Sequence, residues 1–132
     1  MKLTLKLILT ISLMAVSVRG YATENSVLQI CKVITSGQVQ PLYDIFDSSV
    51  EISILGESVV CNKDYAVNVV SDFVGNNPNS VCKVAHHGKR ENSSFCIISI
   101  ASAGKSYRLY ALFRKVSNNL LIQQFRIDDV TE

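Results

Sequence analysis

The chain has 132 residues, of which 48% are hydrophobic and 18% charged, and its formal net charge is +2. Three of its 13 basic side chains lie within the first 20 residues, which leaves 10 basic against 11 acidic side chains in the remainder. That remainder is long enough for one domain with one hydrophobic core. Its balanced charge gives no clustered basic face, so nucleic acid is excluded as an expected partner.

The first 20 residues have the layout of a secretory signal peptide. Lys2 and Lys6 precede an apolar run over residues 7–18, and small residues follow at Gly20 and Ala22. The run is shorter than the roughly 20 residues that span a bilayer. We therefore expect residues 1–20 to be removed by cleavage between residues 17 and 22, with no membrane anchor afterwards. Residues 21–132 then form a single exported domain, periplasmic or secreted.

Two helical patterns open this domain. Asn25–Ser36 carries apolar residues at the spacing of one buried helix face, and Gly37 is placed to end it. A shorter second helix is predicted over Val39–Phe46, where Pro41 is tolerated because it falls in the first turn. The apolar face of the first helix consists of Val27, Ile30, Cys31 and Ile34.

The pattern then changes to a short hairpin and a third helix. Val50–Ile54 alternates apolar and polar side chains, as a half-buried strand does, and a turn at Gly56 leads into Ser58–Cys61. Asn62 is a suitable N-cap for a helix whose inner side chains end at Phe73. Gly75, two asparagines and Pro78 stop that helix.

The rest of the chain has the pattern of long strands separated by turn-rich segments. Together with the preceding elements this predicts an α+β fold. We expect a cone-like curved antiparallel sheet, made of a long meander and the short hairpin, packed against about three helices on the N-terminal side. The strands of the predicted meander are Ser80–His87, Phe95–Ser102, Ser106–Val116 and Leu120–Ile127.

Five short segments carry a resemblance to a known family: Phe46–Ile54, Asn77-Pro78, His86-His87-Gly88, Tyr107-Arg108 and Leu121–Ile127. With these segments and this element order, the chain resembles the nuclear-transport-factor-like, cystatin-like superfamily. Within it the chain is similar to a family of small secreted bacterial proteins, domain of unknown function 4783. The resemblance covers nearly all of residues 21–132. It implies a cone-like fold and an exported location, and it brings no established activity.

Four cysteines are an even number, so disulfides are allowed in an exported chain. Strand alternation puts Cys82 and Cys96 on the same side of one predicted hairpin, and a turn centred near residue 89 sets them opposite each other. This makes a Cys82–Cys96 bridge the better supported pairing and leaves Cys31 with Cys61, a pair that has no geometric support. The default interpretation is that the cysteines are buried free thiols, which pack as small apolar groups.

His86 and His87 are adjacent in a predicted strand. Their side chains therefore point to opposite faces and cannot bind one ion together. No other metal-ligand spacing accompanies them, so neither a metal nor a cofactor is expected. We expect one of the two histidines to face the core or a pocket and the other to face solvent.

Enzymes of the cone fold direct a histidine and a carboxylate into a cavity, and the resemblance implies where to look for them. The candidates here are His86 with Asp47, Asp72 or Tyr43. General acid–base catalysis needs such groups within hydrogen-bond reach of one substrate. Asp47 is equally suited to cap a turn, and no nucleophile motif is present.

The last predicted strand has apolar residues on both faces. Arg126 and Gln124 share one of these faces, and Arg108 lies on the neighbouring strand. Such side chains are candidates for binding an anion or a partner protein through charge-assisted hydrogen bonds. The alternative is structural: the arginines pair with acids such as Glu51 and lie flat over apolar surface.

Two functions follow from these features. The first is a non-catalytic exported module that binds a partner through its open sheet face or a small apolar ligand in its cavity. Strands with apolar residues on both faces favour it, and a second copy of the chain would cover the open face. The second is a small acid–base enzyme, of the isomerase or dehydratase type, which requires His86 and a carboxylate to converge on one pocket.

Overall fold

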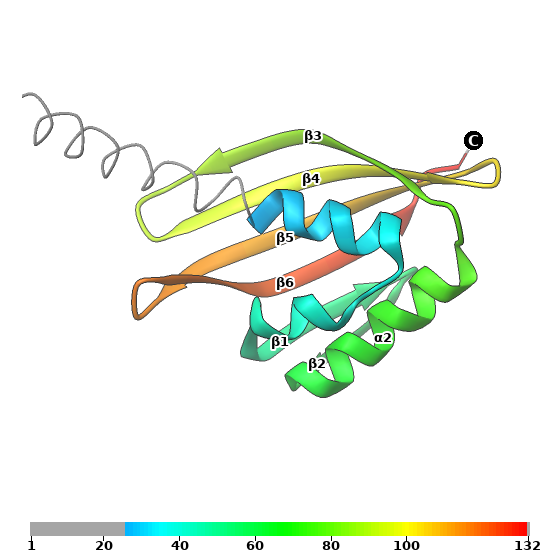
Figure 1. The fold of residues 1–132 in the computed structure, drawn as a ribbon. Helices are drawn as coiled ribbons and strands as arrows, with labels where there is room; N and C mark the ends of the chain where they lie inside the picture. The colour runs from blue at the N-terminus through cyan, green and yellow to red at the C-terminus, as the bar shows by residue number, and fades with distance from the viewer. Residues whose placement is uncertain (1–25, 132) are drawn as a thin grey trace, which may run out of the picture.

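A computed structural model describes residues 26–131, so the predicted signal peptide and its cleavage site lie outside the described residues. Within that range the chain forms one six-stranded curved sheet with two α-helices and one 3-10 turn (Figure 1). The elements are a first helix over residues 26–36, η1 (Gln40–Asp44), β1 (Phe46–Ile54), β2 (Glu57–Cys61), α2 (Lys63–Asn76), β3 (Val81–Lys89), β4 (Ser93–Ser102), β5 (Lys105–Val116) and β6 (Asn119–Asp129).

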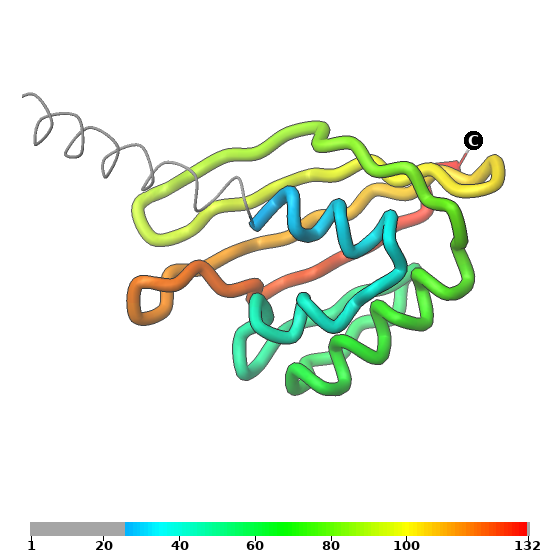
Figure 2. The backbone as a smooth tube through the Cα atoms, in the orientation of Figure 1, coloured from blue at the N-terminus to red at the C-terminus, as the bar shows by residue number. Residues whose placement is uncertain are grey.

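The strand order is β2-β1-β6-β5-β4-β3. Neighbouring strands are antiparallel except β1 and β6, which run parallel. Strands β3 to β6 are the expected meander, and β1 with β2 is the expected hairpin. Figure 2 follows the backbone from the first helix through η1 into β1, and from α2 into β3. The predicted α+β class and curved sheet are therefore confirmed. The expectation of a wholly antiparallel sheet is wrong, because the chain passes through α2 and the meander before β6 pairs with β1 in the parallel direction.

The expectation of about three helices is wrong for the described residues, because Val39–Phe46 forms only a short 3-10 segment and no α-helix. Residues Gln40–Asp44 make a single 3-10 turn, in which Ile45 N–H donates to the Leu42 carbonyl at 3.0 Å. The backbone after this turn pairs with the sheet. The Ile122 N–H donates to the Ile45 carbonyl at 2.8 Å, and Phe46 is the first residue of β1. Pairing with β6 therefore ends the helical segment after one turn.

The two α-helices end and begin where the sequence predicts. Gly37 adopts a φ of +78°, and its N–H donates to the Val33 carbonyl at 3.0 Å, which closes the first helix. The Asn62 side chain accepts a hydrogen bond of 2.9 Å from the Tyr65 N–H and so caps α2. These local signals set the end of the first helix and the start of α2.

Apolar side chains fill the space between the sheet and the helices. The largest fully buried side chains include Phe46, Phe113 and Phe125, and the rings of Phe46 and Phe125 meet edge-on at 5.7 Å. Phe73 of α2 meets Tyr107 of β5 in the same way at 5.1 Å. The interior of the cone is thus a packed core that joins the two layers.

Two β-bulges change which side chains point into this core. In β6, Ile122 lies opposite Phe113 and Gln124 opposite Leu112, so Gln123 is the extra residue. Ile122 and Phe125 are consequently both fully buried, although simple alternation places them on opposite faces. The apolar residues on both predicted faces of β6 result from this bulge. The second bulge lies in β3, between Val84 and His86.

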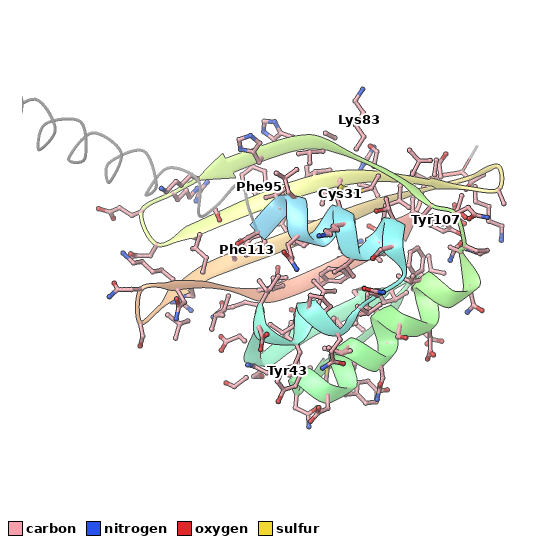
Figure 3. All side chains as sticks on the ribbon, in the orientation of Figure 1. Cys31, Tyr43, Lys83, Phe95, Tyr107 and Phe113 are labelled. Carbon is pink, nitrogen blue, oxygen red and sulfur yellow. A yellow bond between two sulfur atoms is a disulfide. The ribbon has the colours of Figure 1, made fainter. Side chains whose placement is uncertain are left out.

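The disulfide joins Cys31 to Cys82, with the Cα atoms 5.5 Å apart, so both predicted pairings are wrong. Cys61 and Cys96 are free. Strand β3 extends to Lys89, so the connection to β4 is shorter than predicted and Cys82 lies opposite Ile100. Cys96 is four residues from Ile100 along β4, about 13 Å, too far for a bridge to Cys82. The observed bridge fastens the first helix, where Figure 3 labels Cys31, to β3.

The two free thiols are expected to differ in reactivity. Burial raises the pKa of Cys96 to about 11, although a hydrogen bond involving the Ala111 backbone opposes the shift, and burial also raises the pKa of the half-buried Cys61. Because the thiolate is the nucleophile, iodoacetamide near pH 8 should modify Cys61 first and Cys96 only after denaturation. Mass mapping of alkylated peptides measures this order, and equal native rates would contradict it.

The raised pKa of Cys96 also has a consequence for stability. The folded state holds the thiol proton more tightly than the unfolded state does. The contribution of this group to stability is therefore present below pH 9.0, the ordinary pKa, and is lost as the pH rises toward about 11.

Candidate functional site

The predicted acid–base residues do not converge. His86 lies on β3, whereas Asp47 is the second residue of β1 and Tyr43 lies in η1. Strands β4, β5 and β6 separate β3 from β1. At a spacing of about 4.8 Å between neighbouring strands, the four steps from β3 to β1 separate the strand of His86 from the strand of Asp47 by about 19 Å.

Both histidines are exposed, so the expectation that one faces the core or a pocket is wrong. The bulge at Ala85 is the reason, because it reverses the alternation of β3 before His86. The His86 ring consequently lies on the outer face of the sheet, 5.6 Å from the ring of Phe95.

Asp47 and Tyr43 have local partners. The Asp47 carboxylate accepts hydrogen bonds from the Ser48 N–H at 2.7 Å and from the Gln123 side chain at 3.2 Å. The ammonium group of Lys63 lies 4.9 Å from the centre of the Tyr43 ring. The Ser48 N–H bond fits the structural alternative, in which Asp47 caps a turn, here the one that leads into β1.

The three candidate binding residues, Arg108, Gln124 and Arg126, share the outer face of the sheet. Arg126 forms an ion pair of 2.8 Å with Asp128, and Gln124 donates to Glu51 at 3.1 Å. The Arg126 and Asp128 side chains are 60% and 41% exposed, so their pair contributes little to stability. Half-buried aromatic side chains lie on the same face, where Phe95 stacks on Tyr110 with ring centres 6.3 Å apart.

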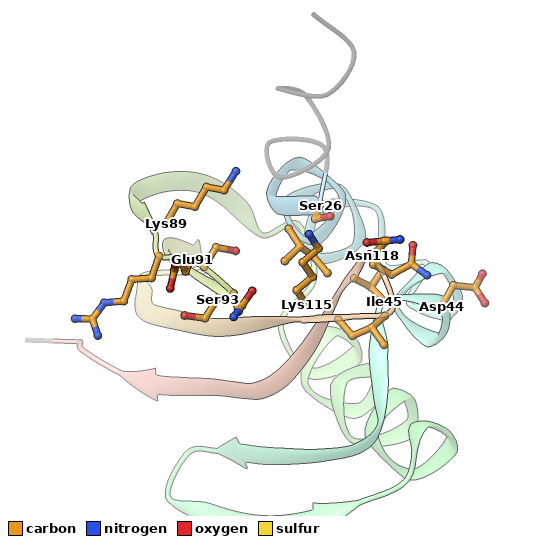
Figure 4. Close-up of a pocket in the computed structure, with 14 residues that line it drawn as sticks. Ser26, Asp44, Ile45, Lys89, Glu91, Ser93, Lys115 and Asn118 are labelled. Atoms are coloured by element: carbon orange, nitrogen blue, oxygen red, sulfur yellow. The ribbon is translucent and has the colours of Figure 1, made fainter. Parts of the chain in front are cut away.

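A pocket with a volume of about 590 Å³ lies at one end of the sheet (Figure 4). Its walls come from the β3–β4 loop, the β5–β6 turn, the end of η1 with the following Ile45, and the start of the first helix. Figure 4 shows Lys89, Glu91 and Ser93 on one side of the pocket and Ile45 with Asn118 on the other. Lys115 lies between these two sides and projects toward Ser26.

The charged side chains of the pocket are mainly basic. Lys89, Arg90 and Lys115 line it, together with the acids Asp44 and Glu91. The Asp44 carboxylate points away from the pocket (Figure 4). Among residues 26–131 the one salt bridge is that of Arg126 with Asp128, on the outer sheet face, so none of the three pocket cations is paired with a carboxylate. The pocket therefore has three cations against two acids, and none of the cations is held in a salt bridge within the described residues.

The pocket lining also includes a buried hydroxyl without a partner. Ser94 is 3% exposed, and its Oγ is the one buried side-chain polar atom of the described residues that makes no hydrogen bond. An unsatisfied buried group costs about 1–3 kcal/mol, so proteins rarely retain one without a reason. Ser94 lies opposite Phe113, and Lys115 follows two residues later, so both point to the helix-covered face of the sheet.

Hydrogen-bond donors dominate this arrangement. Ammonium and guanidinium groups, a hydroxyl and side-chain amides suit a carboxylate or phosphate, which accepts charge-assisted hydrogen bonds. Sequence reasoning missed the pocket, because Ser94 was assigned to a turn and Lys115 to an ordinary strand. The adjacent basic residues Lys89 and Arg90, beside a hairpin loop, were the available signal.

Among the described residues, no three histidine, cysteine or acidic side chains gather to hold a metal ion.

Comparisons with known proteins agree with this geometry at the level of the fold. A family model described as Domain of unknown function (DUF4783) matches residues 27–128. Crystal structures of DUF4783 family proteins from Bacteroides uniformis and Bacteroides ovatus are each 30% identical to the chain, with TM-scores of 0.72. Both alignments cover 78% of this chain, and they cover 95% and 94% of those chains respectively.

A more distant structure shows the wider fold family. An NTF2-like protein of unknown function from Silicibacter pomeroyi is 13% identical, with a TM-score of 0.65 over 86% of this chain and 98% of that one. At this identity the likeness concerns the fold alone. No curated protein matches the chain.

Proposed function

The chain belongs to the DUF4783 family, with an NTF2-like fold, and we propose that it is an exported, non-catalytic module that binds a small carboxylate or phosphate. One observation carries this proposal: three cations without carboxylate partners surround a pocket that is also lined by a buried, unpartnered hydroxyl. An anion would neutralise the cations and could accept a hydrogen bond from Ser94. The volume of about 590 Å³ suits a small molecule.

The polar lining favours an anion over the small apolar ligand expected from the sequence. Apolar side chains instead fill the space between the sheet and the helices, where such a ligand was expected to bind. The acid–base enzyme is the weaker alternative, since His86 lies on the outer face and three strands stand between β3 and β1.

The Cys31–Cys82 disulfide is compatible with an exported protein, because disulfides persist in oxidising compartments. Within residues 26–131 no helix has the length and apolar character needed to cross a membrane. Export itself is part of the proposal and is tested by the N-terminal sequence of the protein recovered from its own host. A new N-terminus between residues 17 and 22 would support export.

Titration of the isotope-labelled protein with inorganic phosphate and with citrate, followed by amide NMR, tests the binding site. The proposal predicts saturable shifts confined to the β3–β4 loop, the end of β5 and the β5–β6 turn. Shifts that fail to saturate, or that cluster on the outer sheet face around Arg108 and Arg126, would contradict it.

Ser94→Ala should have opposite effects on stability and binding. Removing a buried hydroxyl that has no partner relieves its desolvation cost, so the free energy of unfolding of the ligand-free protein should rise by about 1 kcal/mol. Anion affinity should fall, because one donor is lost. Ser99→Ala, at an exposed position on the same strand, is the matched control and should change neither quantity. A stability loss at Ser94 would show that the hydroxyl has a structural partner.

The outer sheet face supports a second candidate, a homodimer. The stacked rings of Phe95 and Tyr110 are half-buried there, on a face that no described helix covers. A second copy would shield these rings from water. This interface stays a prediction, which sedimentation analysis of the mature protein tests, since a strict monomer would exclude it.

A further inference from the structure

A second groove lies between the β1–β2 hairpin and α2, and it shares no lining residue with the anion pocket. Its volume is about 640 Å³. Apolar side chains from both of its walls are exposed: Leu55 is 50% exposed, Val59 40% and Tyr65 53%. Such a concentration of exposed apolar side chains is typical of an interaction surface.

Leu55 is in an unfavourable backbone conformation. It is the first of two turn residues between β1 and β2, with a φ of +51°, and Gly56 follows with a φ of +91°. Turns of this kind favour asparagine, aspartate or glycine at the first position, and a bulky side chain there is an outlier. Because half of the Leu55 side chain is exposed, core packing does not explain its presence. Retained strain of this kind points to a functional contact.

Strand β2 is an unprotected edge of the sheet. It pairs with β1 in continuous register, and no described strand covers its other edge. The opposite edge strand, β3, carries Lys83, Lys89 and a bulge, which are common devices against further pairing. Strand β2 is short and carries the charged Glu57, but it has neither a lysine, a proline nor a bulge, and no described strand occupies its outer edge. That edge is therefore open to an added strand.

The charge of the groove distinguishes between a second copy of the chain and a segment of another protein as its ligand. Its charged lining residues are Glu57 and Asp72, and both are acidic. A symmetric dimer that packed groove against groove would bring the same two acids against each other, and like charges at short range repel. A segment with lysine or arginine beside its apolar residues is complementary instead.

We propose that this groove binds an extended segment of a partner protein, with apolar residues flanked by lysine or arginine, which adds to the sheet along β2. Main-chain hydrogen bonds to β2 supply affinity, and the apolar side chains enter between Leu55, Val59 and Tyr65. The flanking basic groups lie near Glu57 and Asp72. Because the two sites share no lining residue, this proposal stands or falls independently of the anion pocket.

The test uses a short blocked, fluorescent peptide in which valine alternates with threonine between terminal lysines. Two control peptides are compared with it. The first has glutamates in place of the terminal lysines, and the second has N-methyl groups on the backbone amides that would donate to β2. Fluorescence anisotropy should show saturable binding of the lysine peptide and about tenfold weaker binding of the glutamate peptide, a difference of about 1.4 kcal/mol. The N-methylated peptide should not bind.

Two variants locate the site. Leu55→Asn should weaken the lysine peptide about tenfold while preserving the fold, since asparagine tolerates a positive φ. Val81→Thr, which alters an exposed valine on the β3 edge, is the control and should leave affinity unchanged. The proposal would be overturned if Leu55→Asn bound the lysine peptide as tightly as the wild type, or if the wild type did not bind it. It would also be overturned if a peptide titration followed by amide NMR shifted only resonances of β3. A dimer that forms through β2 without peptide would overturn it in favour of a second copy.

Discussion

Cys82→Ser is expected to lower the free energy of unfolding by about 4 kcal/mol. The bridge to Cys31 closes a loop with a sequence separation of 51 residues, and the loop-entropy relation gives a stabilisation of about 4 kcal/mol for that length. The bridge also holds the first helix, whose Ile30 and Ile34 are buried, against β3. Chemical denaturation with and without reductant measures the loss.

Reduction of the wild-type protein should produce a similar loss and should leave Cys82→Ser unchanged. Cys61→Ser is the matched control, because Cys61 is a half-buried free thiol on β2. It should cost less than about 1 kcal/mol and should remain sensitive to reductant. If reduction destabilised Cys82→Ser as strongly as the wild type, the bridge would have to involve other cysteines.

Asn77→Ala is expected to lower the free energy of unfolding by about 3 kcal/mol. The Asn77 side chain joins the end of α2 to the sheet: its amide group donates to the Phe73 carbonyl at 2.9 Å, and its oxygen accepts from the Tyr107 hydroxyl at 2.8 Å. Both Asn77 and Tyr107 are buried. Alanine leaves two buried polar groups without partners, and each costs about 1–3 kcal/mol. Thermal and denaturant unfolding measure the change.

Tyr107→Phe provides the control for this prediction. It keeps the ring that packs against Phe73 and leaves one buried group, the Asn77 oxygen, without a partner, so its cost should be about half that of Asn77→Ala. In the double variant the Tyr107 hydroxyl no longer lacks a partner, and the combined loss should be smaller than the sum of the single losses. Strict additivity would mean that the two side chains do not interact.

Local patterns were sufficient to predict most secondary structure of this chain. The Asn62 cap, Gly37 and the alternation of Val50–Ile54 depend on neighbouring residues alone, and the corresponding elements are confirmed. The prediction of a helix over Val39–Phe46 was wrong, because pairing with β6, a contact distant in sequence, decides where the 3-10 turn ends. Helix propensity depends on neighbouring residues and carries no information about that contact.

Strand register was the step that sequence reasoning could not resolve. A shift in the β3–β4 connection separated Cys82 from Cys96, and one extra residue at Ala85 moved His86 to the other face. A bulge at Gln123 likewise produced the apparent two-sided pattern of β6. An added residue reverses every later side chain of a strand, so small errors of register changed both the disulfide and the candidate catalytic site.

The anion pocket depends on the same long-range register. Ser94 and Lys115 share one face only because β4 and β5 pair with Ser94 opposite Phe113. Lys89 and Arg90 reach the pocket through the β3–β4 loop. Nothing in the spacing of these residues along the chain indicates a common site.

Calorimetric titration of the wild type, Lys115→Gln and Lys83→Gln with inorganic phosphate and with citrate is the most direct test of the proposed function. Lys115 lines the pocket without a carboxylate partner, whereas Lys83 is exposed on β3 outside it. A charge-assisted hydrogen bond contributes about 1.5–3 kcal/mol, so Lys115→Gln should bind at least about tenfold more weakly, and Lys83→Gln should match the wild type. Equal affinities in all three proteins, or no binding of either anion to the wild type, would contradict the account.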